Sequence, residues 1–331
     1  MSFTLISHIT ITNATTNESV TLNGVNDLRI KKGIHSYIDT AIIKIPISGR
    51  LKQKDFTTTS VDTALFFNRG DKVKIQLGYN ETLRTEFIGF VSRINYTSPC
   101  EIECEGYSYQ LRQKNIKTTF KAGTQIREII KHLVEGTDIT LSNAIPNVEL
   151  GSAMQIDNAT ACQVLDKIKE NQLMTIYFNG STLYVGLQQT EVKANVKYKM
   201  GWNTVNDNGL KYHESDDIRA KVVLKVSKKD GDKAIYTTGD PDGEVHEYIV
   251  NAAEKNLKQI AEDHLKKLKF TGFEGKITSL LIPYCEHGFS AEVEDPKYSE
   301  RNGTYFVPSV EISYGMSGAR RIVELSNKLN S

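Results

Sequence analysis

Cys285, Glu286 and His287 follow one another in the chain and bring together a thiol, a carboxylate and an imidazole. An imidazole beside a thiol can take up its proton and so generate a thiolate nucleophile, as in cysteine hydrolases. Cys285 and His287 are two positions apart, so their side chains share one face if this segment is extended. A third residue that would orient the imidazole cannot be identified in the sequence. We therefore do not expect a catalytic pair here.

The segment Gly239-Asp240-Pro241-Asp242-Gly243-Glu244 carries three carboxylates, which could suggest a calcium-binding loop. An EF-hand loop needs a third oxygen-bearing side chain before its glycine and a glutamate well after it, and both are missing. Asp-Pro-Asp-Gly is also a common turn sequence, because proline presets one backbone angle and glycine tolerates positive φ. The sequence therefore predicts a turn.

Cysteines are few and scattered, at Cys100, Cys104, Cys162 and Cys285. Cys100 and Cys104 lie four positions apart on a predicted strand, so both thiols could approach one metal ion. No second Cys or His pair stands at the spacing of a zinc site, and buried free thiols are the expected state. If the protein did hold a metal ion, Cys100/Cys104 and Asp240/Asp242 would be the first candidates.

Gly315-Met316-Ser317-Gly318-Ala319 comes close to the Gly-x-Ser-x-Gly sequence of a nucleophile elbow. Ala319 stands where the last glycine belongs, and the segment lies between two predicted strands rather than between a strand and a helix. We expect a glycine-rich hairpin turn. Since no phosphate-binding glycine loop is present either, the sequence indicates no catalytic residue, no cofactor or nucleotide site and no metal site.

Trp202 is the only tryptophan and lies in Gly201-Trp202-Asn203, just before the last strand-rich section. We expect it to be a boundary residue packed against a neighbouring domain. The alternative is an exposed anchor for a partner, because tryptophan is enriched in interface hot spots.

The chain has 331 residues, enough for two or three domains, and carries 41 Lys and Arg against 40 Asp and Glu, a net charge of +1. Opposite charges are interspersed, which argues against a surface specific for nucleic acid. Residues 1–20 lack the pattern of a secretory signal, and no apolar run approaches the length of a membrane span. We therefore expect synthesis in the cytoplasm and no membrane insertion by this chain.

Apolar residues recur at every second position through most of the chain, for example at Ile218, Ala220, Val222, Leu224 and Val226. This two-residue period is typical of strands with one buried face. In residues 1–117 we expect strands at 3–12, 37–46, 71–79, 86–96 and 101–109, with a turn at 23–24 and a loop at 52–62. Strands of this length with polar connections predict a closed or nearly closed antiparallel barrel.

Residues 118–190 change period. Ile126, Ile129, Ile130, Leu133 and Val134 form a helical stripe over 124–135, with Thr124 as the expected N-cap and Gly136 as the terminating glycine. A second helix is predicted from Thr160, and Asn179-Gly180 predicts a hairpin between 174–178 and 181–187. We expect a small α/β module that faces outward and whose removal leaves both barrels intact.

Residues 191–331 return to the strand pattern and predict a second β-barrel. Strands are expected at 218–226, 234–238, 275–283, 289–294, 304–313 and 320–326, with a turn at 228–231. One helix, at about 254–268, interrupts them. The predicted class is therefore mainly β: two antiparallel barrels plus an α+β insertion.

This order of segments resembles the late control gene D family of phage tail proteins, the baseplate hubs of contractile tails, which are related to the N-terminal part of type VI secretion spike proteins. The likeness covers nearly the whole chain and is carried by Phe67–Ile75, Phe87–Val91, Glu103–Ser108, the helix at 124–135, Gly303–Val310, and Gly318 with Arg321–Leu325. In the family a glycine-aspartate loop often precedes the late strand, where Glu286–Ser290 stands here. The contacts of that loop are therefore expected to differ.

The resemblance implies two tail-tube-like barrels per chain and a homotrimeric ring that joins the tail tube to a separate spike protein within the virion baseplate. Incomplete barrels can pair their edge strands between subunits, and closed symmetry stops further association. The implied role is structural rather than enzymatic. Two alternatives stay open: a tail-associated peptidoglycan hydrolase, which would need a pair of carboxylates, and a receptor- or sugar-binding tail module with aromatic residues in one groove.

Overall fold

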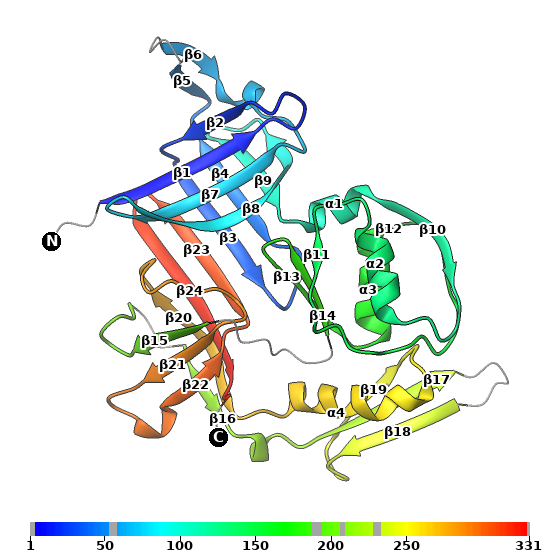
Figure 1. Ribbon diagram of the computed structural model, residues 1–331. Helices are drawn as coiled ribbons and strands as arrows, with labels where there is room; N and C mark the ends of the chain where they lie inside the picture. The colour runs from blue at the N-terminus through cyan, green and yellow to red at the C-terminus, as the bar shows by residue number, and fades with distance from the viewer. Residues whose placement is uncertain (1–3, 53–57, 187–193, 206–208, 228–232, 330–331) are drawn as a thin grey trace.

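The computed structural model describes residues 4–52, 58–186, 194–205, 209–227 and 233–329, and its largest element is one eleven-stranded sheet (Figure 1). The strand order is β16-β20-β24-β23-β3-β4-β9-β8-β7-β1-β2. Their bounds are β1 Leu5–Thr12, β2 Ser19–Leu22, β3 Asp27–Gly33, β4 Thr40–Ile45, β7 Lys72–Tyr79, β8 Thr82–Asn95, β9 Cys100–Glu105, β16 Lys211–His213, β20 Gly272–Ser279, β23 Ser309–Gly315 and β24 Gly318–Asn327.

The two β sections meet edge to edge within this sheet. β3 pairs with β23 in antiparallel register, with Ile30 opposite Ile312. Every neighbouring pair in the sheet is antiparallel. The mainly β class and its antiparallel sheets are therefore confirmed, and the structure adds that a single hydrogen-bonded ladder joins the N-terminal and C-terminal strands.

A three-stranded sheet packs against the C-terminal part of the large sheet. It consists of β15 Asn195–Lys199, β21 Ser290–Glu294 and β22 Gly303–Phe306, with β15 parallel to β21. Buried side chains from this sheet, such as Tyr198 and Val293, share one hydrophobic core with Ile277 of the large sheet. At the opposite end of the molecule β5 Ser48–Lys52 and β6 Thr58–Asp62 form a projecting hairpin (Figure 1).

The middle region contains the two predicted helices and the predicted hairpin. Its elements are α1 Ser108–Gln113, β10 Asn115–Phe120, α2 Ile126–Val134, β11 Thr140–Leu141, β12 Met154–Thr160, α3 Ala161–Asn171, β13 Thr175–Asn179 and β14 Thr182–Gly186. The stripe of α2 is buried, and Thr160 caps α3 in a reciprocal capping box with Gln163. Gly136 has φ +77° directly after α2, as expected. The N-cap of α2 is Gln125, so the prediction of Thr124 is wrong by one residue.

A further unit packs beside the middle region: β17 Ala220–Ser227, β18 Lys233–Gly239 and β19 Glu244–Ile249, covered by α4 Leu257–Leu268. Its buried residues, including Leu224 and Ile260, belong to the same hydrophobic core as α2 and α3. The chain between β19 and α4 is bound to the middle region: Asn251 N donates to Asn171 O (2.9 Å). The domain division at 117/118 and 190/191 stays a prediction. Residue 190 and the expected turn at 228–231 lie outside the described residues.

Three strand predictions are wrong in their bounds. The strand expected over 275–283 is β20, which already ends at Ser279. The strand expected over 101–109 ends at Glu105, and α1 begins at Ser108, because the chain turns at Gly106, where a Cβ would lie 3.1 Å from Asp39 Cβ. The strand expected over 304–313 is two strands, β22 and β23, separated by Val307 and Pro308. Proline has no backbone N–H to give to a ladder, which explains the break.

Candidate functional site

The segment from Cys285 to His287 lies between β20 and β21 and is not part of a described strand. Cys285 is fully buried, and burial raises the pKa of its thiol to about 12. His287 is also buried, and its Nε2 donates to the carbonyl oxygen of Phe178 (2.6 Å). Its ring packs edge-on against Tyr177 at 5.8 Å between centroids. The Cys285 thiol therefore stays protonated, and the His287 imidazole connects this loop to β13 through its hydrogen bond.

Arg321 and Glu86 form a fully buried ion pair that sequence reasoning missed. Arg321 Nη2 lies 2.7 Å from Glu86 Oε1 and Nη1 lies 3.2 Å from Oε2, with side chains 0% and 1% exposed. Arg321 Nη1 also donates to Cys285 O (2.8 Å). Side chains alternate between the two faces of β24, so Arg321 lies on the buried face together with Val323 and Leu325. The same two-residue period in the sequence already marked position 321 as buried. The pair joins β8 to β24.

A second set of polar residues lines a cleft of about 240 Å³ next to the Arg321–Glu86 pair. Lys32 of β3 forms an ion pair with Glu286. Burial raises the pKa of Glu286, but the Lys32 ammonium together with Tyr284 and His287 outweighs burial, so this pKa lies below its usual value. Asp39, 7% exposed, also lines the cleft, and burial raises its pKa to about 7 against the lowering effect of Lys32. Its Oδ1 has no hydrogen-bond partner among the described residues. Besides Glu86, the cleft thus holds the Asp39 carboxyl, which is partly protonated near neutral pH, and the ionised Glu286 carboxylate.

The acidic segment at 239–244 forms the predicted turn between β18 and β19. Gly243 N donates to Asp240 O (3.0 Å), which closes the turn. Asp240 Oδ2 pairs with Lys269 Nζ at 3.0 Å, and this hydrogen bond lowers the pKa of Asp240. Asp242 lies 3.7 Å from Arg219. Both carboxylates therefore face cations of the protein.

The structure also shows where the other residues singled out in the sequence lie. Cys100 and Cys104 lie on β9 and are buried, and burial raises the pKa of both thiols. Gly315 and Gly318 end and begin β23 and β24, so the predicted hairpin turn is confirmed, and Met316 at its tip is 96% exposed. Trp202 is 79% exposed, so the prediction that it packs against a neighbouring domain is wrong.

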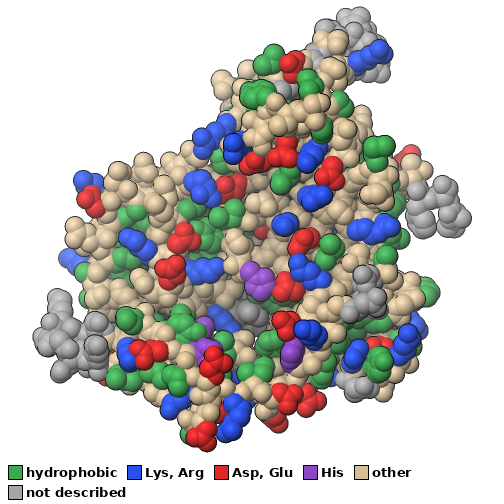
Figure 2. All heavy atoms as spheres, turned by 180° about the vertical axis from the view of Figure 1, so that it is seen from behind, with side chains coloured by type: hydrophobic (Ala, Val, Ile, Leu, Met, Phe, Trp, Pro, Cys, Tyr) green, Lys and Arg blue, Asp and Glu red, His purple; other side chains and the backbone are tan. Residues whose placement is uncertain are grey.

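Within the parts of the chain that the structure describes, no group of three or more His, Cys, Asp or Glu residues could hold a metal ion. No described helix is long and apolar enough to cross a membrane. Figure 2 shows Lys and Arg side chains interspersed with Asp and Glu over the rear face.

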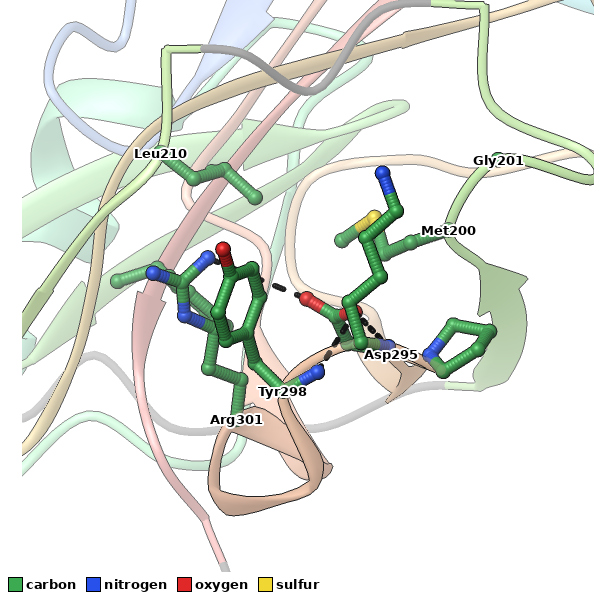
Figure 3. A pocket seen from close by; sticks show the side chains of 9 residues that line it. Met200, Gly201, Leu210, Asp295, Tyr298 and Arg301 are labelled. Carbon is green, nitrogen blue, oxygen red and sulfur yellow. Dashed lines mark hydrogen bonds and ion pairs between the residues drawn. The ribbon is translucent and has the colours of Figure 1, made fainter.

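An open pocket of about 500 Å³ lies where β15, β20 and the β21–β22 connection meet (Figure 3). Met200, Leu210 and Phe273 supply apolar wall, and Asp295, Tyr298 and Arg301 line it from the β21–β22 connection. Asp295 Oδ1 accepts hydrogen bonds from the backbone N–H groups of Lys297 (2.8 Å) and Tyr298 (3.2 Å), which fixes the connection. The Arg301 guanidinium stacks on the Tyr298 ring at 4.3 Å. The arrangement combines an apolar wall with exposed cations.

Comparison with known proteins gives a whole-chain match in structure. No protein-family model and no curated protein matches the sequence. The tail protein from Neisseria meningitidis MC58 superposes with a TM-score of 0.66 at 12% identity, over 97% of this chain and 96% of that protein. The 43 kDa tail protein of prophage MuSo2 from Shewanella oneidensis gives 0.64 at 13% identity, over 98% of each chain. The chain has the fold of phage tail proteins.

The same tail-protein fold extends to a secretion-system protein. The Escherichia coli c3393 protein, described as a component of the type VI secretion system, superposes with a TM-score of 0.55 at 9% identity. The match covers 93% of this chain and 74% of that protein. The likeness to tail proteins and type VI proteins that the sequence indicated is thus confirmed for the fold.

Proposed function

We propose that this protein is a structural hub of a phage or prophage-derived tail baseplate. In this role three copies form a ring that joins the tail tube to a separate central spike protein and contacts other baseplate proteins. The chain is made in the bacterial cytoplasm and assembled into the virion. The observation that carries the proposal is the match to two tail proteins over nearly the whole length of all three chains.

The edges of the large sheet give this proposal a physical basis. β2 and β16 are the outermost strands of the eleven-stranded sheet, so each has one side without a partner in that sheet. Unpaired edges readily pair with another chain, and a closed ring satisfies them without runaway association. A contact from β2 of one copy to β16 of the next is heterologous, as a threefold ring requires.

The peptidoglycan hydrolase alternative has weaker support. Asp39 and Glu286 line one cleft, but Asp39 is 7% exposed and Glu286 pairs with Lys32. Neither carboxylate is presented openly to a polysaccharide chain, which favours the non-enzymatic role. Zymography on purified peptidoglycan separates the two functions, because a cleared zone that disappears in Asp39→Asn would support the hydrolase.

The ring is tested by light scattering at high protein concentration, where the mass should be that of three chains. Cysteines placed at Ser19 of β2 and Lys211 of β16 should form disulfide-linked species that stop at the trimer, since the four native cysteines are buried. Each single variant, which can link only two chains, is the matched control. A stable twofold dimer would contradict the ring.

A further inference from the structure

The pocket of Figure 3 contains two cations, Arg301 and Lys297, whose side chains donate no hydrogen bond to a described residue. Arg301 Nη1 lies 3.9 Å from Asp295 Oδ2, beyond hydrogen-bond distance, and no described residue accepts a hydrogen bond from this guanidinium. No described carboxylate lies within ion-pair distance of the Lys297 ammonium. Among the lining side chains that the structure describes, Asp295 is the only acidic one, against the two cations Lys297 and Arg301. Arginine offers a planar fork of N–H donors that matches a carboxylate.

The opposite wall of the pocket is apolar. Met200 and Phe273 are 8% and 1% exposed and belong to the core beneath, and Leu210 is partly buried on the same core. Pro296 and the Tyr298 ring continue the apolar surface on the side of the β21–β22 connection. A volume of about 500 Å³ is within the range of small-molecule sites. An occupant that satisfies both walls needs an anionic group joined directly to an apolar group.

We propose that this pocket binds a carboxylate carried on an apolar group, the chemistry shared by a small aliphatic or aromatic acid and by a polypeptide that ends in a large hydrophobic residue. The carboxylate lies between Arg301 and Lys297, and the apolar group packs on Met200, Leu210 and Pro296. The stacking of Arg301 on Tyr298 holds the guanidinium in place before the ligand arrives, which limits the entropy lost on binding.

Trp202 gives a direct readout, because it is the only tryptophan, is 79% exposed and follows the pocket residue Gly201. The full chain is titrated with N-acetyl-leucine, with its uncharged amide and with acetate, and Trp202 fluorescence is recorded. We expect saturable binding of N-acetyl-leucine at least about tenfold tighter than that of either comparison compound, because each lacks one of the two groups. Equal binding of the amide, or no saturable binding of the acid, overturns the proposal.

Two variants test the assignment of the cations. Arg301→Gln and Lys297→Glu should each weaken N-acetyl-leucine binding by about tenfold or more, as expected for loss of a charge-assisted hydrogen bond. Lys297 is exposed and its backbone N–H still caps Asp295, so this variant keeps its fold even if Arg301→Gln does not. Arg29→Gln on β3, outside the pocket, is the matched control and should bind like the native protein. Unchanged affinity in Lys297→Glu overturns the assignment.

The source of the carboxylate is distinguished by two further probes, 4-methylpentanoate and the tripeptide Gly-Gly-Leu. Both carry the same apolar group and carboxylate, but only the peptide has backbone amides. Tighter binding of the peptide supports the C-terminus of a protein chain as the natural ligand, whereas equal binding supports a small acid. Failure of both to compete with N-acetyl-leucine overturns the proposal.

Discussion

Replacing Arg321 with methionine should strongly destabilise the protein. The side chain is 0% exposed and holds Glu86, itself 1% exposed, through contacts of 2.7 and 3.2 Å. Methionine fills much of the volume but leaves the Glu86 carboxylate buried without its cation. Removing one partner of a buried ion pair typically costs about 3–5 kcal/mol. We expect a loss of this size in the free energy of unfolding.

A second substitution separates the unpaired charge from the loss of packing. In the double variant Glu86→Leu, Arg321→Met no charge remains, so most of the penalty should disappear. The carbonyl of Cys285 still loses its donor, a hydrogen bond of 2.8 Å to Arg321, which costs about 1 kcal/mol. The double variant should therefore be more stable than the single Arg321→Met variant by about 2–4 kcal/mol.

The assay is chemical denaturation followed by circular dichroism, together with amide hydrogen exchange of β8 and β24, the strands that the pair joins. Lys197→Met is the control, because the Lys197 and Glu292 side chains form an ion pair at 3.0 Å but are 56% and 44% exposed. Such an exposed pair is worth less than about 1 kcal/mol. A loss in Arg321→Met no larger than that of the control would refute the reasoning.

Three further predictions concern titrating groups and the middle region. Asp39 keeps its proton up to about pH 7 in the folded protein but loses it near pH 3.9 in the unfolded chain. The free energy of unfolding should therefore fall as the pH rises from about 3.9 to 7. Denaturation midpoints measured over this range should not show the fall in Asp39→Asn. Burial lowers the pKa of His264 to about 4, so the free energy of unfolding should fall as the pH drops from about 6.5 to 4. The fall should be smaller in His264→Phe, and equal acid sensitivity of the two proteins would contradict this. Deleting residues 118–190 should leave the eleven-stranded sheet intact, because none of its strands lies in this range. The deletion should expose α4 to amide hydrogen exchange, because α4 shares a hydrophobic core with the deleted helices. Full protection of α4 would show that it does not depend on the shared core.

Local structure could be predicted where a few consecutive residues decide it. The apolar spacing from Ile126 to Val134 indicated α2, because only a helix places these residues on one face. Thr160 and Asn179-Gly180 marked a helix start and a hairpin, since capping and positive φ are properties of single residues and their neighbours. The short helix α1 was missed, because its six residues are too few to show a period.

The sequence by itself thus determined the mainly β class, the principal helices and the turns at 179–180, 239–244 and 315–318, and it indicated the resemblance to tail proteins. Only the tertiary structure decided that β3 pairs with β23, that Arg321 meets Glu86 across 235 positions, and that Trp202 is exposed. The pocket at Arg301 also comes from segments that are distant in the chain. The physical reason is that alternation fixes which face of a strand is buried but not which strand lies beside it. Edge pairing, buried ion pairs and pockets depend on contacts between distant segments, which residue spacing does not encode.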